Sequence, residues 1–157
     1  GVFYIRRPDE ARGRIFAITE KQMPVVAGDG KQTLEELILN DPRALPMARI
    51  YLEKQHARLH EVLAEGERIQ LVELGTHCRG AYFGDGMRFA TPQLEAEIDR
   101  VSKAFDGFYF GRYDVRSDTV EAFASGRFKV LELNGVTSEA TSIYDASRSA
   151  IDAYKIL

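Results

Sequence analysis

Three side chains with oxygen ligands stand on two short alternating segments late in the sequence. Asp114 lies in segment 111–116, and Glu132 and Asn134 lie in segment 130–134. Mg²⁺ typically takes one or two carboxylates and completes its octahedral shell with water and substrate phosphate oxygens. The three residues therefore predict a platform for a metal–nucleotide complex rather than an all-protein metal cage.

The alternation within the first segment decides which side chains stand together. Side chains of a strand point to opposite faces with a period of two. Arg112, Asp114 and Arg116 should therefore share one face, while Tyr113 and Val115 take the other. The arginines would offset the negative charge that develops on a transferring phosphoryl group.

The second segment has the same alternation. Glu132 and Asn134 should share a face, whereas Leu131 and Leu133 should face the core. If the two strands pair, the carboxylates, the amide and the guanidiniums converge on one surface. The alternative is a solvated polar face with salt bridges across the strands.

A small, hydroxyl-rich loop follows the second segment. It begins at Gly135 and contains Thr137, Ser138 and Thr141. Such a loop suits a position beside phosphates. The alternative is a plain turn that leads into a last helix.

The elements that must position these residues follow from hydrophobic periodicity and turn signals. One helix is predicted to begin after Thr33, whose side chain should form a capping box with Glu36. The other predicted helices are 47–64, 92–105 and 146–156. Strands are predicted over 2–6, 14–19, 69–74, 108–115 and 128–133, with a turn at 28–30 and a loop over 75–91. The order lacks a regular strand–helix–strand alternation, so we expect an α+β fold with a largely antiparallel sheet packed with helices.

Length and composition favour one domain and exclude several classes of protein. The chain has 157 residues, of which 45% are hydrophobic and 29% charged, as in ordinary globular domains. A net charge of −3 gives no general attraction to nucleic acid or anionic membranes, and no apolar run approaches the roughly 18 residues of a membrane span. The single cysteine, Cys78, fits a reducing cytoplasm.

The first residue is not Met and 2–5 reads as a strand under way, which predicts a fragment of a longer polypeptide.

Motifs near both ends of the chain resemble those of a known family. Gly111-Arg112-Tyr113-Asp114, followed by Glu132-Leu133-Asn134-Gly135, resembles the terminal signature of the ATP-grasp superfamily, in the branch of D-alanine–D-alanine ligase. Residues 26–38 are similar to a stretch in cyanophycin-synthetase-like members. The resemblance implies that the whole of 1–157 is an ATP-grasp C-terminal domain.

The resemblance also implies roles for individual residues. Asp114 and Asn134 would each bind one Mg²⁺, Glu132 would bridge both ions, and Arg112 would contact the reacting phosphoryl or acyl group. Mn²⁺ could replace Mg²⁺. Ser138 or the backbone amides near it could bind the carboxylate substrate, as the corresponding loop does in the ligases that the chain resembles.

Further implied sites lie in the first strand. Residues 3–6 would fall near the hinge that receives adenine, which makes Phe3 and Tyr4 candidates for nucleotide binding.

The implied activity is ATP- and Mg²⁺-dependent ligation of a small carboxylate to an amine through an acylphosphate. The ATP-grasp lobe that would supply the phosphate-contacting lysines has no counterpart in the sequence, so we expect it to precede this segment as a partner. Weak or absent ATP turnover is expected from the 157 residues alone. A nucleotide-binding regulatory domain without catalysis and a plain interaction domain stay as alternatives.

One further loop could bind substrate. Gly75 and Gly80 bracket a polar cluster after a predicted strand, in which Arg79 would contact an anion and His77 would hydrogen-bond the substrate. The alternative is a tight loop whose glycines only permit unusual backbone angles. Cys78 has no orienting group that would favour a nucleophilic role.

Overall fold

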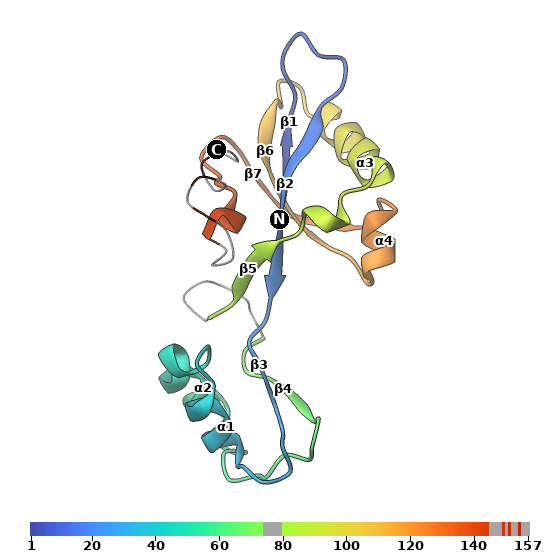
Figure 1. The fold of residues 1–157 in the computed structure, drawn as a ribbon. Helices are drawn as coiled ribbons and strands as arrows, with labels where there is room; N and C mark the ends of the chain where they lie inside the picture. The colour runs from blue at the N-terminus through green and yellow to red at the C-terminus, as the bar shows by residue number, and fades with distance from the viewer. Residues whose placement is uncertain (74–79, 145–148, 150, 152–153, 155–157) are drawn as a thin grey trace. The chain divides into compact units, whose positions relative to one another are not determined.

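The computed structural model describes residues 1–73, 80–144, 149, 151 and 154. The chain divides into two compact units, one built from 1–20 with 83–157 and the other from 21–82 (Figure 1). No helix in the described part of the chain has the length and apolar character needed to cross a membrane.

The first unit is built on a five-stranded sheet with the order β5-β2-β1-β6-β7. β1 pairs antiparallel with both β2 and β6, and β6 pairs antiparallel with β7. The strands are β1 (Val2–Ile5), β2 (Arg14–Gln22), β5 (Tyr82–Asp85), β6 (Phe110–Arg116) and β7 (Lys129–Asn134). The α+β class with a largely antiparallel sheet is therefore confirmed.

Helix α3 (Pro92–Lys103) covers one face of this sheet, with the short α4 (Val120–Ala124) beside it (Figure 1). Thr91 caps α3 by accepting a hydrogen bond from the Leu94 backbone, and Pro92 occupies the first turn, where no N–H is needed. The core between α3 and the sheet consists of Val2, Tyr4, Ile15, Ile18, Leu94, Ile98 and Tyr113.

The opposite face of the sheet carries a smaller hydrophobic core. Phe3 and Ala17 pack there against Ala140. The short 3-10 helix η4 (Thr141–Tyr144) is tied to this face because Thr19 Oγ1 accepts a hydrogen bond of 3.2 Å from the Ser142 backbone.

The second unit has its own core. β3 (Val25–Ala27) pairs antiparallel with β4 (Arg68–Gln70). The helices are α1 (Leu34–Asn40), η1 (Leu45–Met47) and α2 (Ala48–Lys54). The predicted capping box between Thr33 and Glu36 is present at the start of α1. The core residues are Val26, Leu34, Ile38, Ala44, Ala48, Tyr51, Leu63, Ile69, Leu71 and Val72.

The helix predicted over 47–64 is wrong in its second half. α2 ends at Lys54, and the chain continues in turns. The backbone of the later segment serves the start of α1 instead: Leu34 N donates to Glu61 O at 2.9 Å and Glu35 N donates to Leu59 O at 3.1 Å. The N–H groups at the start of a helix need such partners.

Several short elements were not predicted. The segment expected to be a loop over 75–91 contains β5 and the 3-10 helix η3 (Met87–Phe89). α4 lies in the connection between β6 and β7, where Thr119 caps it. The helix predicted over 146–156 lies almost entirely outside the described residues.

A buried polar network joins α3 to the first two strands of the sheet. The Asp99 carboxylate accepts hydrogen bonds from Tyr4 Oη and Gly13 N, both at 2.8 Å, and from Lys103 Nζ at 2.7 Å. Burial and the hydrogen bond to Asp99 raise the pKa of Tyr4 to about 12. Burial acts to raise the pKa of Asp99, but its three hydrogen bonds outweigh burial and hold this pKa below its ordinary value.

The raised pKa of Tyr4 predicts a loss of stability at high pH. The folded protein keeps the Tyr4 phenol protonated, whereas the unfolded chain ionises near pH 10, so this contribution is present below pH 10 and lost as pH rises toward 12. Between pH 10 and 12 the free energy of unfolding should fall by about 2 kcal/mol through this group. Denaturant titrations of wild type and Tyr4→Phe isolate the effect, since the variant lacks the phenol. Parallel pH profiles for the two proteins would contradict the assignment.

Candidate functional site

The register of β6 and β7 brings the predicted polar residues together on one sheet surface. Asp114 lies directly opposite Glu132, and Arg112 lies directly opposite Asn134. The strand pairing on which the predicted convergence depends is therefore present.

These four side chains form one connected chain of polar contacts. Arg112 Nε lies 2.9 Å from Asp114 Oδ1, and Arg112 Nη2 donates to Asp114 Oδ2 at 3.3 Å. With the Asn134 amide oriented so that each atom faces a complementary partner, its nitrogen donates to Glu132 Oε1 and its oxygen accepts from Arg112 Nη2, both at 3.2 Å. Asn134 thus links the guanidinium to the second carboxylate.

The charges of this set suit a cation. Two carboxylates directly opposite each other on neighbouring strands repel, and one guanidinium offsets only part of that charge. The donor set of Asp114, Glu132 and Asn134 is entirely oxygen-based, as Mg²⁺ prefers. Within the described residues, no group of three or more His, Cys, Asp or Glu side chains is placed to hold a metal. An ion here would therefore need the Asn134 amide and oxygens from water or a substrate.

Phe3 supports Arg112 from the neighbouring strand. Phe3 pairs with Arg112 across β1 and β6, and the Arg112 guanidinium carbon lies 5.9 Å from the centre of the Phe3 ring. Phe3 is fully buried and packs edge-on against Phe16. Its contact with the polar set in this structure is therefore made through Arg112.

Two other candidates lie away from this set. Tyr4 is fully buried on the α3 side of the sheet, where its hydroxyl donates to Asp99. Arg116 is exposed at the end of β6, opposite Lys129. The structure does not bring Tyr4 to the polar face.

The loop after β7 forms a tight turn. The backbone N–H of Ser138 donates to Gly135 O at 3.0 Å, and the Ser138 hydroxyl donates to the same oxygen at 2.7 Å. Both candidates therefore belong to one turn that directly follows Asn134. The other loop candidates, His77 and Arg79, lie outside the described residues.

The expectation that Leu131 and Leu133 face the core is wrong for Leu131, whereas Leu133 lies opposite the buried Tyr113 and is only partly covered. Their exposed fractions are 66% and 37%. The β6–β7 register shifts between Asp114 and Val115, which leaves Leu131 as the extra residue of a bulge. β7 is also the edge strand of the sheet, so its side chains have neighbours on one side only.

Gly111 permits the close approach of β7 to β6. A Cβ at this position would lie 2.4 Å from the backbone oxygen of Asn134 and 2.6 Å from the Phe108 ring. Gly111→Ala should therefore push β7 away from β6 and lower the free energy of unfolding by about 2 kcal/mol or more. Gly135→Ala is the matched control because a Cβ there would meet nothing within 4 Å. Equal thermal denaturation midpoints for the two variants would contradict this account.

The comparisons with known proteins identify a shared fold. No protein-family model matches the chain, and a sequence search of curated proteins found no match. Among solved structures, the chain is similar to a bifunctional glutathione synthetase from Pasteurella multocida, with a TM-score of 0.59 and 15% sequence identity. The match covers 99% of this chain and 23% of that one. At this identity the likeness establishes the fold, and the chain spans less than a quarter of the similar protein.

Proposed function

We propose that the chain is the nucleotide- and magnesium-binding C-terminal part of an ATP-grasp ligase that joins a small carboxylate to an amine. The observation that carries the proposal is the convergence of Arg112, Asp114, Glu132 and Asn134 on paired strands. The fold likeness to a glutathione synthetase supports the ligase class, and the resemblance of 111–114 and 132–135 to the ATP-grasp signature supports the family.

The proposed chemistry has two steps. A carboxylate oxygen attacks the γ-phosphorus of ATP, and the bond between this phosphorus and the β–γ bridging oxygen breaks. ADP departs, and the carboxylate has become an acylphosphate. An amine nitrogen then attacks the acyl carbon, phosphate departs, and the amine loses a proton as the amide forms. Neither step needs a covalent nucleophile from the protein, so positioning and fixed charge are what the protein supplies.

The residues of the polar set would divide these tasks. Asp114, Glu132 and Asn134 would hold Mg²⁺, which neutralises phosphate charge when bound. Arg112 would place its guanidinium against the transferred phosphoryl group. The turn made by Gly135 and Ser138 would offer backbone and hydroxyl groups to the carboxylate substrate.

The remaining parts of the proposal concern the longer protein. A preceding ATP-grasp lobe would close over the nucleotide, and a cytoplasmic location would supply ATP and magnesium. We therefore expect the 157 residues alone to release ADP from ATP weakly or not at all.

A direct assay of the full-length protein tests the proposed function. Mg²⁺–ATP is incubated with a panel of carboxylates and amines, ADP release is followed, and hydroxylamine is added to trap an acylphosphate as its hydroxamate. ADP release that needs both magnesium and a carboxylate, with hydroxamate formed, is the expected result. Nucleotide binding without any carboxylate-dependent release would favour the regulatory alternative, and no nucleotide binding would favour a structural role for the polar face.

A further inference from the structure

Arg112 engages both carboxylate oxygens of Asp114. Its Nε lies 2.9 Å from Oδ1 and its Nη2 donates to Oδ2 at 3.3 Å. A metal ion that bound either oxygen would meet a positive guanidinium within bonding distance of the same group. The guanidinium and a metal ion bound through Asp114 therefore compete for the same carboxylate.

The ion pair between Arg112 and Asp114 can open, because water reaches it and its alignment is imperfect. The side chains of Arg112 and Asp114 are 21% and 25% exposed, so water reaches both. Arg112 Nε is buried, yet among the described residues it has no hydrogen-bond partner of good geometry, although Asp114 Oδ1 is close. The ion pair is thus imperfectly aligned, which lowers the cost of opening it.

Arg112 keeps one other contact when the pair opens, because its guanidinium lies over the Phe3 ring. Its 3.2 Å hydrogen bond to the Asn134 amide oxygen would also give way to a cation bound by that oxygen. Phe3 is fixed because it is fully buried. The released guanidinium would therefore stay at the site with donors free for an anion.

We infer that the Arg112–Asp114 ion pair is a latch that a divalent cation opens: cation binding at Asp114 displaces the guanidinium and so makes it available to an anionic group. This inference rests on the proposed function and adds a regulation to the same site. Binding of the cation and binding of a phosphate-bearing ligand are then positively coupled, and the coupling is reciprocal. Without the cation the site keeps its own guanidinium neutralised.

Manganese binding to the nucleotide-free, full-length protein tests the latch. Free Mn²⁺ is measured by electron paramagnetic resonance during titration of wild type, Arg112→Lys and Arg127→Lys. Arg112→Lys keeps the positive charge but cannot engage both carboxylate oxygens of Asp114. The dissociation constant for Mn²⁺ should therefore fall about threefold relative to wild type. Arg127→Lys makes the same chemical change at an exposed position just before β7 and should leave the constant unchanged.

A second readout follows Arg112 itself. In protein labelled with ¹⁵N-arginine, the Nε–H resonance of Arg112, assigned by its loss in Arg112→Lys, should shift as Mg²⁺ is added. A fixed resonance, or equal manganese affinity for wild type and Arg112→Lys, would overturn the latch while leaving the metal site intact. Absence of manganese binding in all three proteins would overturn the latch and the proposed function together.

Discussion

Glu132→Gln should abolish most of the ligase activity that we propose for the full-length protein while leaving its stability unchanged. The substitution keeps the size of the side chain and removes its charge. Glu132 lies directly opposite Asp114 and is linked through Asn134 to Arg112. Loss of one preorganised charge at a phosphoryl-transfer site should lower kcat for carboxylate-dependent ADP release by about 10²–10³-fold. Steady-state kinetics at saturating ATP measure this effect.

The exposure of Glu132 separates catalysis from folding. Glu132 is exposed on the edge strand, so its substitution should change the free energy of unfolding by less than about 0.5 kcal/mol. Glu53→Gln is the matched control, since Glu53 is exposed on α2 in the other unit. A kcat for Glu132→Gln within threefold of that of Glu53→Gln would remove Glu132 from the proposed centre.

Asp99→Asn, unlike Glu132→Gln, should cause a large loss of stability. The Asp99 side chain accepts hydrogen bonds from Tyr4, Gly13 and Lys103, and the residue is only 8% exposed. An amide cannot accept all three, and it leaves the Lys103 ammonium unpaired. The free energy of unfolding should fall by about 2–4 kcal/mol, measured by urea denaturation at neutral pH.

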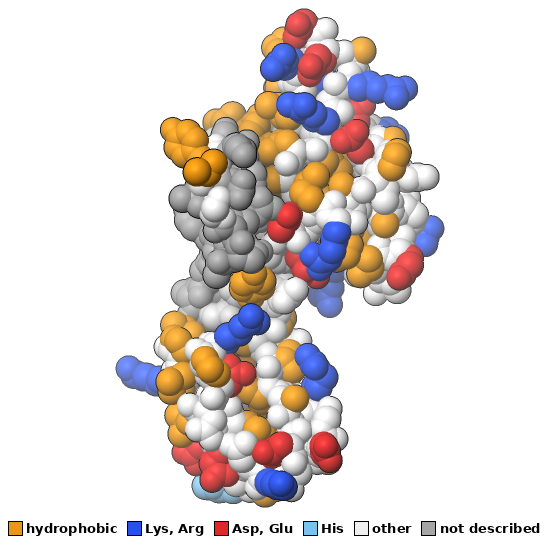
Figure 2. Space-filling model, viewed as in Figure 1, with side chains coloured by type: hydrophobic (Ala, Val, Ile, Leu, Met, Phe, Trp, Pro, Cys, Tyr) orange, Lys and Arg blue, Asp and Glu red, His pale blue; other side chains and the backbone are white. Residues whose placement is uncertain are grey.

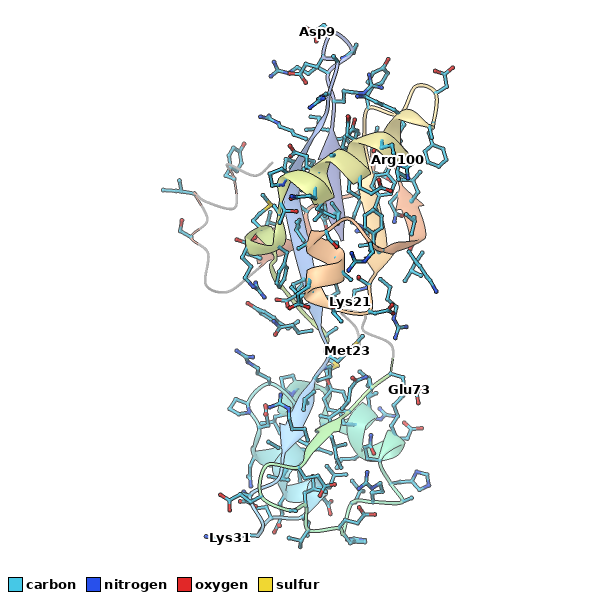
Figure 3. The ribbon with its side chains drawn as sticks, turned by 90° about the vertical axis from the view of Figure 1, so that its right-hand side faces the viewer. Asp9, Lys21, Met23, Lys31, Glu73 and Arg100 are labelled. Atoms are coloured by element: carbon cyan, nitrogen blue, oxygen red, sulfur yellow. The ribbon has the colours of Figure 1, made fainter. Side chains whose placement is uncertain are left out.

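The same helix provides the control for Asp99. Glu97 pairs with Arg100, which Figure 3 labels on α3 and whose side chain is 70% exposed. Exposed pairs of this kind contribute little, so Glu97→Gln should cost less than about 1 kcal/mol. Comparable losses for Glu97→Gln and Asp99→Asn would show that burial does not decide the contribution of these carboxylates.

Charged side chains of both signs share the face of the molecule drawn in Figure 2. Lys and Arg side chains are interspersed there with Asp and Glu side chains over the described part of the face in view. The net charge is −3.

The polar face of the site could be predicted from sequence because buried and polar residues alternate in β6 from Gly111 to Asp114. Arg112 and Asp114 are separated by Tyr113, which is fully buried. The alternation therefore encodes both the core side and the site side of β6. The metal and nucleotide roles of the site residues stay predictions that the experiments above test.

The exact neighbours of the site could not be predicted, because they depend on pairing between distant segments. The bulge at Leu131 depends on the register between β6 and β7, which a connection containing α4 does not fix locally. The support of Arg112 by Phe3 depends on the pairing of β1 with β6. β5 escaped prediction because its four residues, Tyr-Phe-Gly-Asp, carry no apolar alternation.

Calorimetric titration of the full-length protein with ADP, with and without Mg²⁺, tests the central claim most directly. The claim is that Asp114, Glu132 and Asn134 form a magnesium–nucleotide site beside Arg112. Wild type should bind ADP at least about tenfold more tightly with Mg²⁺ than with a chelator, and Asp114→Asn should lose that difference, because metal affinity depends on its charged ligands. An equal magnesium dependence in wild type and Asp114→Asn would contradict the claim.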